Sequence, residues 1–134
     1  MPDPIPDVRS GYVRQAHRPI LYLSGAMHGS KERPDDRDMA SAVARLYAKT
    51  LWLYGYAVFT PHGNTDFMFG SGLYSEPFME LDLAVIETLA ECIFMLPGWE
   101  KSDGCAEELT AARSKGIKEL YSLQEAYEWL SRTV

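Results

Sequence analysis

Four short, mostly apolar segments stand out along the chain, each bounded by proline, glycine or polar residues. They cover residues 20–23, 57–60, 92–96 and 117–121. Segments of about four to eight such residues between turn residues are typical of buried β-strands and are too short for most helices. The segment 92–96 is apolar throughout, as expected for a central parallel strand that is covered on both faces. The pattern therefore predicts four strands.

Between these segments, apolar residues recur at intervals of three and four, which is the spacing of one helix face. This spacing predicts helices at residues 39–54, 76–90, 103–115 and 123–130. Gly55 and Gly116 are natural helix stops. The recurring positions of the first helix are Val43, Leu46, Tyr47, Thr50 and Leu51, and the expected buried face of the second is Phe78, Leu81, Val85, Ile86 and Leu89.

The alternation of strands and helices predicts an α/β fold whose mostly parallel sheet is joined by right-handed crossovers. We expect a small doubly wound sheet of four to five strands, flavodoxin-like in strand order, with helices on both faces. Residues 1–18 contain three prolines and few core-forming residues, so we expect them to form an irregular arm. Residues 19–134 then form a single domain.

Charge and cysteine content narrow the class of protein. A net charge of −6 argues against binding to nucleic-acid polymers or anionic membranes, since phosphate groups call for clustered lysine and arginine. No apolar run approaches the length of a membrane span, and the acidic, proline-rich N-terminus does not resemble a signal peptide. The two cysteines, Cys92 and Cys105, suggest no disulfide framework. We therefore expect a soluble cytoplasmic protein.

Glycine and polar residues cluster in the loops that follow the first three predicted strands. Because ligands bind at the carboxyl ends of the strands in an open α/β sheet, these loops are expected to converge on one site. Met27 is expected either to line such a site or to pack in the core. The histidines and cysteines match no standard ligand spacing, so no metal site is predicted. The candidate residues are Gly25, Met27, His28, His62, Asn64, Ser102, Gly104 and Glu108.

The segment 102–108 is the most informative of the three. It follows a strand and a Pro-Gly turn, and Ser102 is placed to cap the next helix. Helix N-termini present unpaired N–H groups to anions, so Ser102 and Gly104 would form an anion site that Glu108 also faces. The plain alternative is a capped helix with surface glutamates. We expect Glu107 on the solvent side in either case.

Three motifs in this order resemble the nucleoside 2-deoxyribosyltransferase superfamily, in particular its phage and bacterial branch. Residues 22–29 (YLSGAMHG) match the family's first-strand signature. Residues 80–83 (ELDL) are similar to its helix motif with an invariant aspartate, here Asp82. Ser102, Gly104 and Glu108 are similar to its nucleophile motif. The resemblance covers roughly residues 19–121.

The resemblance implies a role for three residues. Glu108 would attack the anomeric carbon of a 2-deoxyribonucleoside and form a glycosyl-enzyme ester. Tyr22 would orient Glu108 through a hydrogen bond, and Asp82 would lie near the leaving base and assist its protonation.

The resemblance also bears on the ligand. Family members that act on free nucleosides carry Asp at the position of Ser102, whereas 5′-monophosphate N-glycosidases carry Ser. An aspartate would repel a phosphate, so Ser102 favours a 2′-deoxynucleoside 5′-monophosphate. His28 stands where those glycosidases use Arg and would make a second phosphate contact. No cofactor is implied, and a homodimer is the default oligomer.

Three classes of function stay open at this point. The first is an N-glycosidase or deoxyribosyltransferase, in which either water or a second base attacks the intermediate. The second is a non-catalytic module that binds a nucleotide on the same fold. The third is a structural protein that has kept the fold alone. The sequence does not identify the base.

Overall fold

A sheet of four parallel strands forms the centre of the protein. The computed structural model describes residues 6–7, 12–13, 17–26, 36–62 and 75–133. The sheet strands are β3 (Ile20–Ser24), β4 (Ala57–Phe59), β5 (Cys92–Met95) and β6 (Lys118–Leu120). They lie in the order β4–β3–β5–β6, and each neighbouring pair is parallel. This is a flavodoxin-like order, so the predicted fold class is confirmed.

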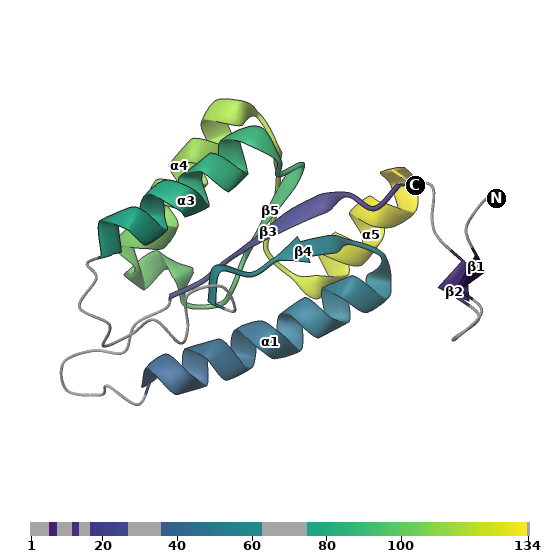
Figure 1. Ribbon diagram of the computed structural model, residues 1–134, viewed down its shortest axis with the longest axis horizontal. Helices are drawn as coiled ribbons and strands as arrows, with labels where there is room; N and C mark the ends of the chain where they lie inside the picture. Colours follow the sequence, from purple (N-terminus) through teal and green to yellow (C-terminus); the bar gives the residue numbers. More distant parts are fainter. Residues whose placement is uncertain (1–5, 8–11, 14–16, 27–35, 63–74, 134) are drawn as a thin grey trace.

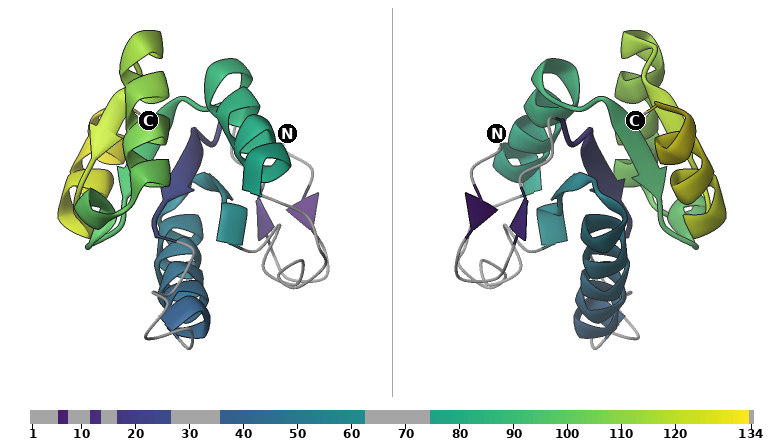
Figure 2. Two further views of the ribbon diagram at one scale, coloured as in Figure 1. Left: turned by 90° about the vertical axis from the view of Figure 1, so that its left-hand side faces the viewer. Right: turned by 90° about the vertical axis from the view of Figure 1, so that its right-hand side faces the viewer.

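Helices cover both faces of this sheet (Figures 1 and 2). One face is covered by α1 (Asp36–Tyr54) and α5 (Leu123–Thr133). The other is covered by α3 (Ser75–Thr88) and α4 (Asp103–Lys115). The short 3-10 helix η2 (Trp99–Lys101) lies between β5 and α4. Strands and helices alternate along the chain from β3 onward, as parallel neighbours require.

The sheet separates two hydrophobic cores, because successive side chains of a strand point to opposite faces. On β3, Leu21 and Leu23 face α1 and α5, whereas Tyr22 faces α3 and α4. The first core also contains Ala44, Leu51, Tyr56, Cys92, Phe94, Leu96, Leu120 and Ala126. The second also contains Val85, Ile86, Ala90, Ile93, Met95, Cys105, Leu109 and Ala112.

Two helices bury the predicted face only in part: Leu51 of α1 and Val85 and Ile86 of α3 are buried as expected, but other predicted positions are not. Leu46 of α1 is exposed, and the small residue Ala44 is buried against the sheet instead. On α3, Leu81 and Leu89 are exposed, and Asp82 is buried beside Val85 and Ile86. The sheet surface under α3 carries the polar side chains of Tyr22 and Ser24, so a carboxylate can occupy a buried position there. α1 also begins before residue 39, the predicted start.

Two short strands precede the sheet and are not predicted from the sequence. β1 (Pro6–Asp7) pairs with β2 (Tyr12–Val13) in an antiparallel arrangement. Just before β3, Arg18 donates hydrogen bonds to the carbonyl oxygens of Trp52 and Tyr56, at 3.1 and 3.0 Å. These bonds attach the start of β3 to the end of α1.

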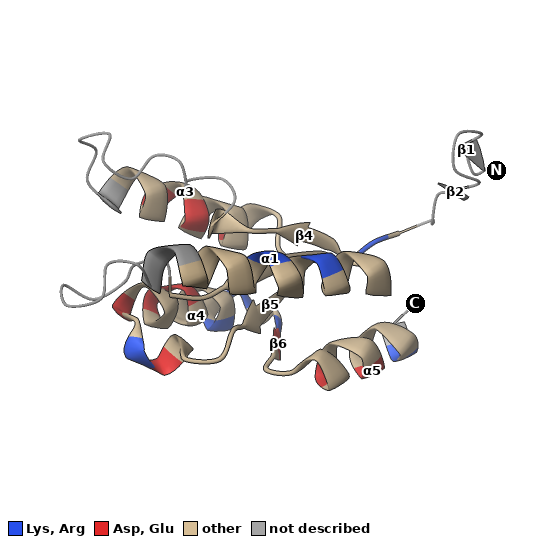
Figure 3. Ribbon diagram, turned by 90° about the horizontal axis from the view of Figure 1, so that it is seen from below, with Lys and Arg blue, Asp and Glu red and all other residues tan. Residues whose placement is uncertain are grey.

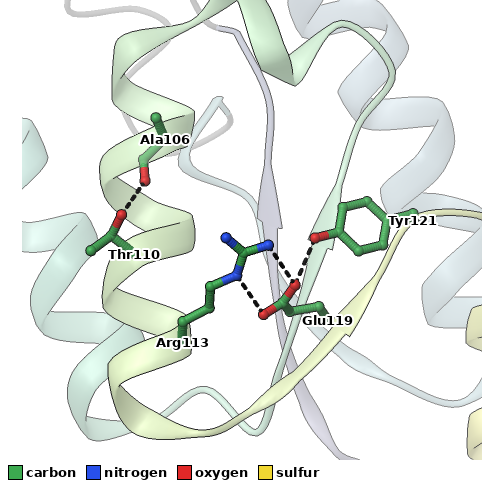
Figure 4. A network of polar contacts seen from close by, with 5 residues as sticks. All are labelled: Ala106, Thr110, Arg113, Glu119 and Tyr121. Carbon is green, nitrogen blue, oxygen red and sulfur yellow. Dashed lines mark hydrogen bonds and ion pairs between the residues drawn. The ribbon is translucent and has the colours of Figure 1, made fainter.

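A network of polar contacts joins α4 to the region of β6 (Figure 4). Arg113 of α4 forms a two-pronged ion pair with Glu119 of β6, with N–O distances of 2.9 and 3.2 Å. The Tyr121 hydroxyl donates a third hydrogen bond, 2.7 Å long, to the same carboxylate. These contacts lower the pKa of Glu119, with the Arg113 hydrogen bonds as the largest cause. The network fixes the C-terminal half of α4, whose N-terminus belongs to the candidate site.

The described charged side chains differ between the helices (Figure 3). Those of α1 are lysine and arginine, those of α3 are aspartate and glutamate, and α4 and α5 carry both signs. No helix in the described part of the chain is both long enough and apolar enough to cross a membrane.

Candidate functional site

The site begins with two polar side chains on the central strand β3. Tyr22 and Ser24 are two residues apart and therefore point to the same face of the sheet, toward α3 and α4. Both residues are fully buried. The Tyr22 ring stacks on Phe59 of the neighbouring strand, with ring centroids 5.6 Å apart. The two hydroxyl groups are thus held on a rigid surface.

Both hydroxyls bind one carboxylate, that of Glu108 in the second turn of α4. Tyr22 Oη donates to Glu108 Oε2 at 2.6 Å, and Ser24 Oγ donates to Oε1, also at 2.6 Å. Glu108 is only 5% exposed, whereas its neighbour Glu107 is exposed, as predicted. Short bonds from O–H donors are typical of an ionised acceptor. Glu108 is therefore a buried carboxylate that hydroxyl groups hold in place.

A second carboxylate, Asp82 of α3, lies against the same tyrosine. Its side chain is 2% exposed, and its Oδ1 atom has no hydrogen-bond partner within the described residues. The Tyr22 hydroxyl interacts with Asp82 as well as with Glu108. A buried polar atom without a partner is unusual in a folded protein and points to a ligand or proton that the site accepts.

Burial makes both carboxyl groups weaker acids. It raises the pKa of Glu108 to about 7, against the opposing effect of the hydrogen bonds from Ser24 and Tyr22. The negative charges of Asp82 and Glu107 add to the increase. Burial likewise raises the pKa of Asp82 to about 6, and the pKa of Tyr22 is raised far above its ordinary value. Both carboxyl groups therefore gain or lose a proton near neutral pH, which is typical of groups that act in acid–base catalysis.

The N-terminus of α4 has the predicted cap. Ser102 is the N-cap residue, and its side chain accepts a hydrogen bond from the Cys105 backbone N–H at 3.2 Å. A side chain at Gly104 would come within 3.1 Å of the Met79 methyl group and 3.7 Å of Ser102 Oγ. The Met79 side chain of α3 thus packs close to Gly104, and a larger residue at this position would have to displace it.

Gly25 and His62 are explained in large part by packing. A Cβ atom at Gly25 would lie 2.5 Å from Leu96 Cδ1, so the close approach of these two segments requires glycine. His62 is buried, and its Nε2 lies 3.0 Å from the carbonyl oxygen of Ala26. This contact joins the segments that follow β3 and β4, two of the three segments expected to converge.

The other candidates fall outside the described part of the chain. Met27, His28 and Asn64 are among the residues whose structure is not described. The described residues contain no group of three or more His, Cys, Asp or Glu side chains that could hold a metal ion. Cys92 and Cys105 are free, buried and on opposite faces of the sheet.

Ser24 is a part of the site that the sequence analysis does not identify. The signal is present in the strand pattern, because Tyr22 and Ser24 are polar positions alternating with Leu21 and Leu23. Inside a strand that is otherwise apolar, two polar residues on one face indicate a polar partner on the element that covers them.

Comparison with known proteins gives one result. The model of a family described as "Domain of unknown function (DUF4406)" matches residues 19–121. The match runs from the start of β3 to the end of β6 and includes Tyr22, Asp82 and Glu108. A search of curated proteins finds no match.

Proposed function

This chain belongs to the DUF4406 family, and we propose that it cleaves the N-glycosidic bond of a 2′-deoxynucleoside 5′-monophosphate. Glu108 acts as the nucleophile and forms a glycosyl-enzyme intermediate, which water or a second base then resolves. One observation carries the proposal: a buried Glu108 carboxylate is held by the Tyr22 and Ser24 hydroxyls, without a cation among the groups that shift its pKa. The resemblance of three sequence motifs to the nucleoside 2-deoxyribosyltransferase superfamily supports it.

The chemistry matches a carboxylate in this setting. Breaking an N-glycosidic bond builds positive charge at C1′ of the sugar, and a nearby carboxylate stabilises that charge and then bonds to the carbon. A salt link to lysine or arginine would neutralise such a nucleophile. Glu108 instead accepts hydrogen bonds from neutral hydroxyls, which orient it and leave its charge available.

Each step balances within the named groups. In the first, a Glu108 oxygen bonds to C1′ while the C1′–N bond breaks; its electron pair goes to the base, which takes the proton of Asp82. In the second, a water molecule attacks C1′, the ester bond breaks, Glu108 leaves as a carboxylate, and Asp82 recovers a proton from the water. Burial raises the pKa of Asp82 to about 6 and that of Glu108 to about 7, so the pair shares a proton between these values, and the reactive form is the one with this proton on Asp82 and the charge on Glu108. In base transfer the incoming base takes the place of water.

The N-terminus of α4 supplies the anion site in this proposal. Ser102 caps the helix, and Gly104 adds no side chain of its own to the first turn, so backbone N–H groups of that turn and the Ser102 hydroxyl would bind a 5′-phosphate. Asp103 is exposed, which allows its charge to point to solvent. Because Glu108 lies in the same helix, one element would bind the phosphate and attack the sugar.

The decisive experiment compares two adjacent glutamates. The protein is incubated with a panel of 2′-deoxynucleoside 5′-monophosphates, with and without a second free base, and released base is measured by chromatography. We expect release that is lost in Glu108→Ala and retained in Glu107→Ala, since only Glu108 is buried in the site. Saturable nucleotide binding without release would contradict catalysis and favour a binding module. Neither release nor binding would leave a structural role.

A homodimer and a cytoplasmic setting are further parts of the proposal. Met39, Leu46 and Leu53 recur every seven residues on α1 and are 65%, 68% and 77% exposed, which supports a contact with a second copy. Sedimentation velocity tests the dimer, and a monomer at micromolar concentration would contradict it. Both cysteines are free and buried, which suits a reducing compartment.

A further inference from the structure

We propose that Ser24 is a positioning residue for Glu108: its hydroxyl fixes the orientation of the carboxylate and keeps it in the anionic form that attacks the sugar. This inference rests on the proposed function of Glu108, but its physical content is a separate statement about one hydrogen bond. Tyr22 is the partner that the motif resemblance implies. Ser24 is a second partner, which its hydrogen bond to Oε1 identifies.

The geometry assigns one hydroxyl to each carboxylate oxygen. Tyr22 binds Oε2 and Ser24 binds Oε1, both at 2.6 Å. A glutamate carboxylate held at one oxygen can still rotate about its last side-chain bond. Donors to both oxygens remove that freedom, and here both donors stand on one central strand between β4 and β5. Ser24 is fully buried, so water cannot replace its hydroxyl without a rearrangement.

The hydrogen bond from Ser24 affects the charge of Glu108 as well as its orientation, because of the groups that surround this carboxylate. The titratable groups that act on Glu108 are Tyr22 from β3, Asp82 from α3, the neighbouring Cys105 of α4 and, from the solvent side of the same helix, Glu107. None of them is a cation. Among the described residues, the two hydroxyl hydrogen bonds are therefore the interactions that favour the ionised form of Glu108 over the protonated form.

The Cys105 thiol lies close to the same serine. Its pKa is raised by burial, and hydrogen bonds with Ser102 and Ser24 oppose that increase. A Ser hydroxyl has a single proton to donate. In the structure the Ser24 hydroxyl donates this proton to Glu108 Oε1. It can therefore accept a hydrogen bond from the Cys105 thiol but cannot donate one to it.

The test measures the pKa of Glu108 directly. Protein labelled with ¹³C at the glutamate carboxyl groups is titrated by NMR, and the Glu108 signal is assigned from its loss in Glu108→Gln. We expect Ser24→Ala to raise the pKa of Glu108 by about one unit, because a hydrogen bond to a charged group is removed. Ser41→Ala is the matched control: Ser41 is also buried but lies on α1, across the sheet, and its removal should leave the Glu108 pKa unchanged.

Kinetics give the second readout. In Ser24→Ala the acid limb of the kcat/KM profile should shift to higher pH together with the pKa of Glu108. At pH values below that pKa, kcat/KM should therefore be about tenfold lower than in the wild type, and the loss should be smaller at higher pH. If Ser24→Ala does not fold, Ser24→Cys keeps a weaker donor and should shift the pKa in the same direction by a smaller amount. An unchanged Glu108 pKa in the folded variant overturns the role of Ser24.

The failures of the two proposals are distinguishable. Base release that depends on Glu108, together with an unmoved pKa and acid limb in Ser24→Ala, would remove only the role of Ser24. A raised pKa in a protein that releases no base would remove the glycosidase proposal and leave the Ser24 hydrogen bond as a structural fact.

Discussion

Glu108 combines burial with acidic surroundings, a combination that is unfavourable for a residue whose role is purely structural. It is almost fully buried, and it belongs to a group of acidic side chains with no basic partner in the described part of the chain. Burial of an ionised carboxylate is unfavourable, and the hydrogen bonds from Tyr22 and Ser24 offset only part of that cost. Proteins keep such groups where function needs them.

This unfavourable burial predicts a pH-dependent gain in stability for Glu108→Gln. The folded-state pKa of about 7 lies above the unfolded value of 4.5, so the folded protein binds more protons between these values. The free energy of unfolding therefore falls as the pH rises through that range. At pH 8 Glu108→Gln should be more stable than the wild type by roughly 1–3 kcal/mol, and near pH 4 the difference should vanish. Denaturant unfolding at both pH values measures it.

Glu107→Gln is the control for that measurement. Glu107 is exposed and adjacent in sequence, so its substitution should leave the difference between the two pH values close to that of the wild type. A Glu108→Gln variant that is less stable than the wild type at pH 8 would contradict the account of a costly buried charge.

The N-terminus of α4 is the element on which the ligand proposal depends. Ser102 has a structural role there, since it caps the helix, and it has a proposed role in phosphate binding. Asp and Ser are equally good N-cap residues, but only Asp repels a phosphate. The two roles can therefore be separated by one substitution.

Ser102→Asp should leave the fold stable and change the choice of substrate. We expect its KM for a 5′-monophosphate to rise about tenfold or more, while activity on the matching nucleoside changes little. Ser102→Ala serves as the comparison: it removes the cap, costs about 1 kcal/mol of stability and introduces no repulsion. Equal effects of Ser102→Asp on the monophosphate and the nucleoside would contradict a phosphate at this helix end.

At the level of elements, the sequence predicts where strands and helices lie better than which helix face is buried. The four strands are marked by short apolar segments, and α4 by its Ser102 cap and its Gly116 stop, which has a φ of 71°. The face of α3 is predicted only in part, because Val85 and Ile86 are buried as expected whereas Leu81 and Leu89 are exposed. Packing against Tyr22 buries Asp82 instead. The spacing of apolar residues does not predict this burial, although the ELDL motif marks Asp82 as a candidate.

The whole molecule shows why the site is only partly visible in the sequence. Tyr22, Asp82 and Glu108 come from β3, α3 and α4, and the parallel sheet brings them together. Short motifs predict that each of the three has a role. The hydrogen bond of Ser24 and the packing reason for Gly25 depend on neighbours distant in sequence, so they require the structure.

The central claim is a covalent bond between Glu108 and the sugar, and peptide mass spectrometry of the acid-quenched protein tests it most directly. The protein is mixed with a 2′-deoxynucleoside 5′-monophosphate, quenched in acid and digested with trypsin, and the peptide of residues 102–113 is sequenced in the spectrometer. We expect a deoxyribosyl phosphate on Glu108 that persists in Glu107→Ala and is absent from Glu108→Ala. Base release without any adduct, or an adduct on another residue, would contradict the account.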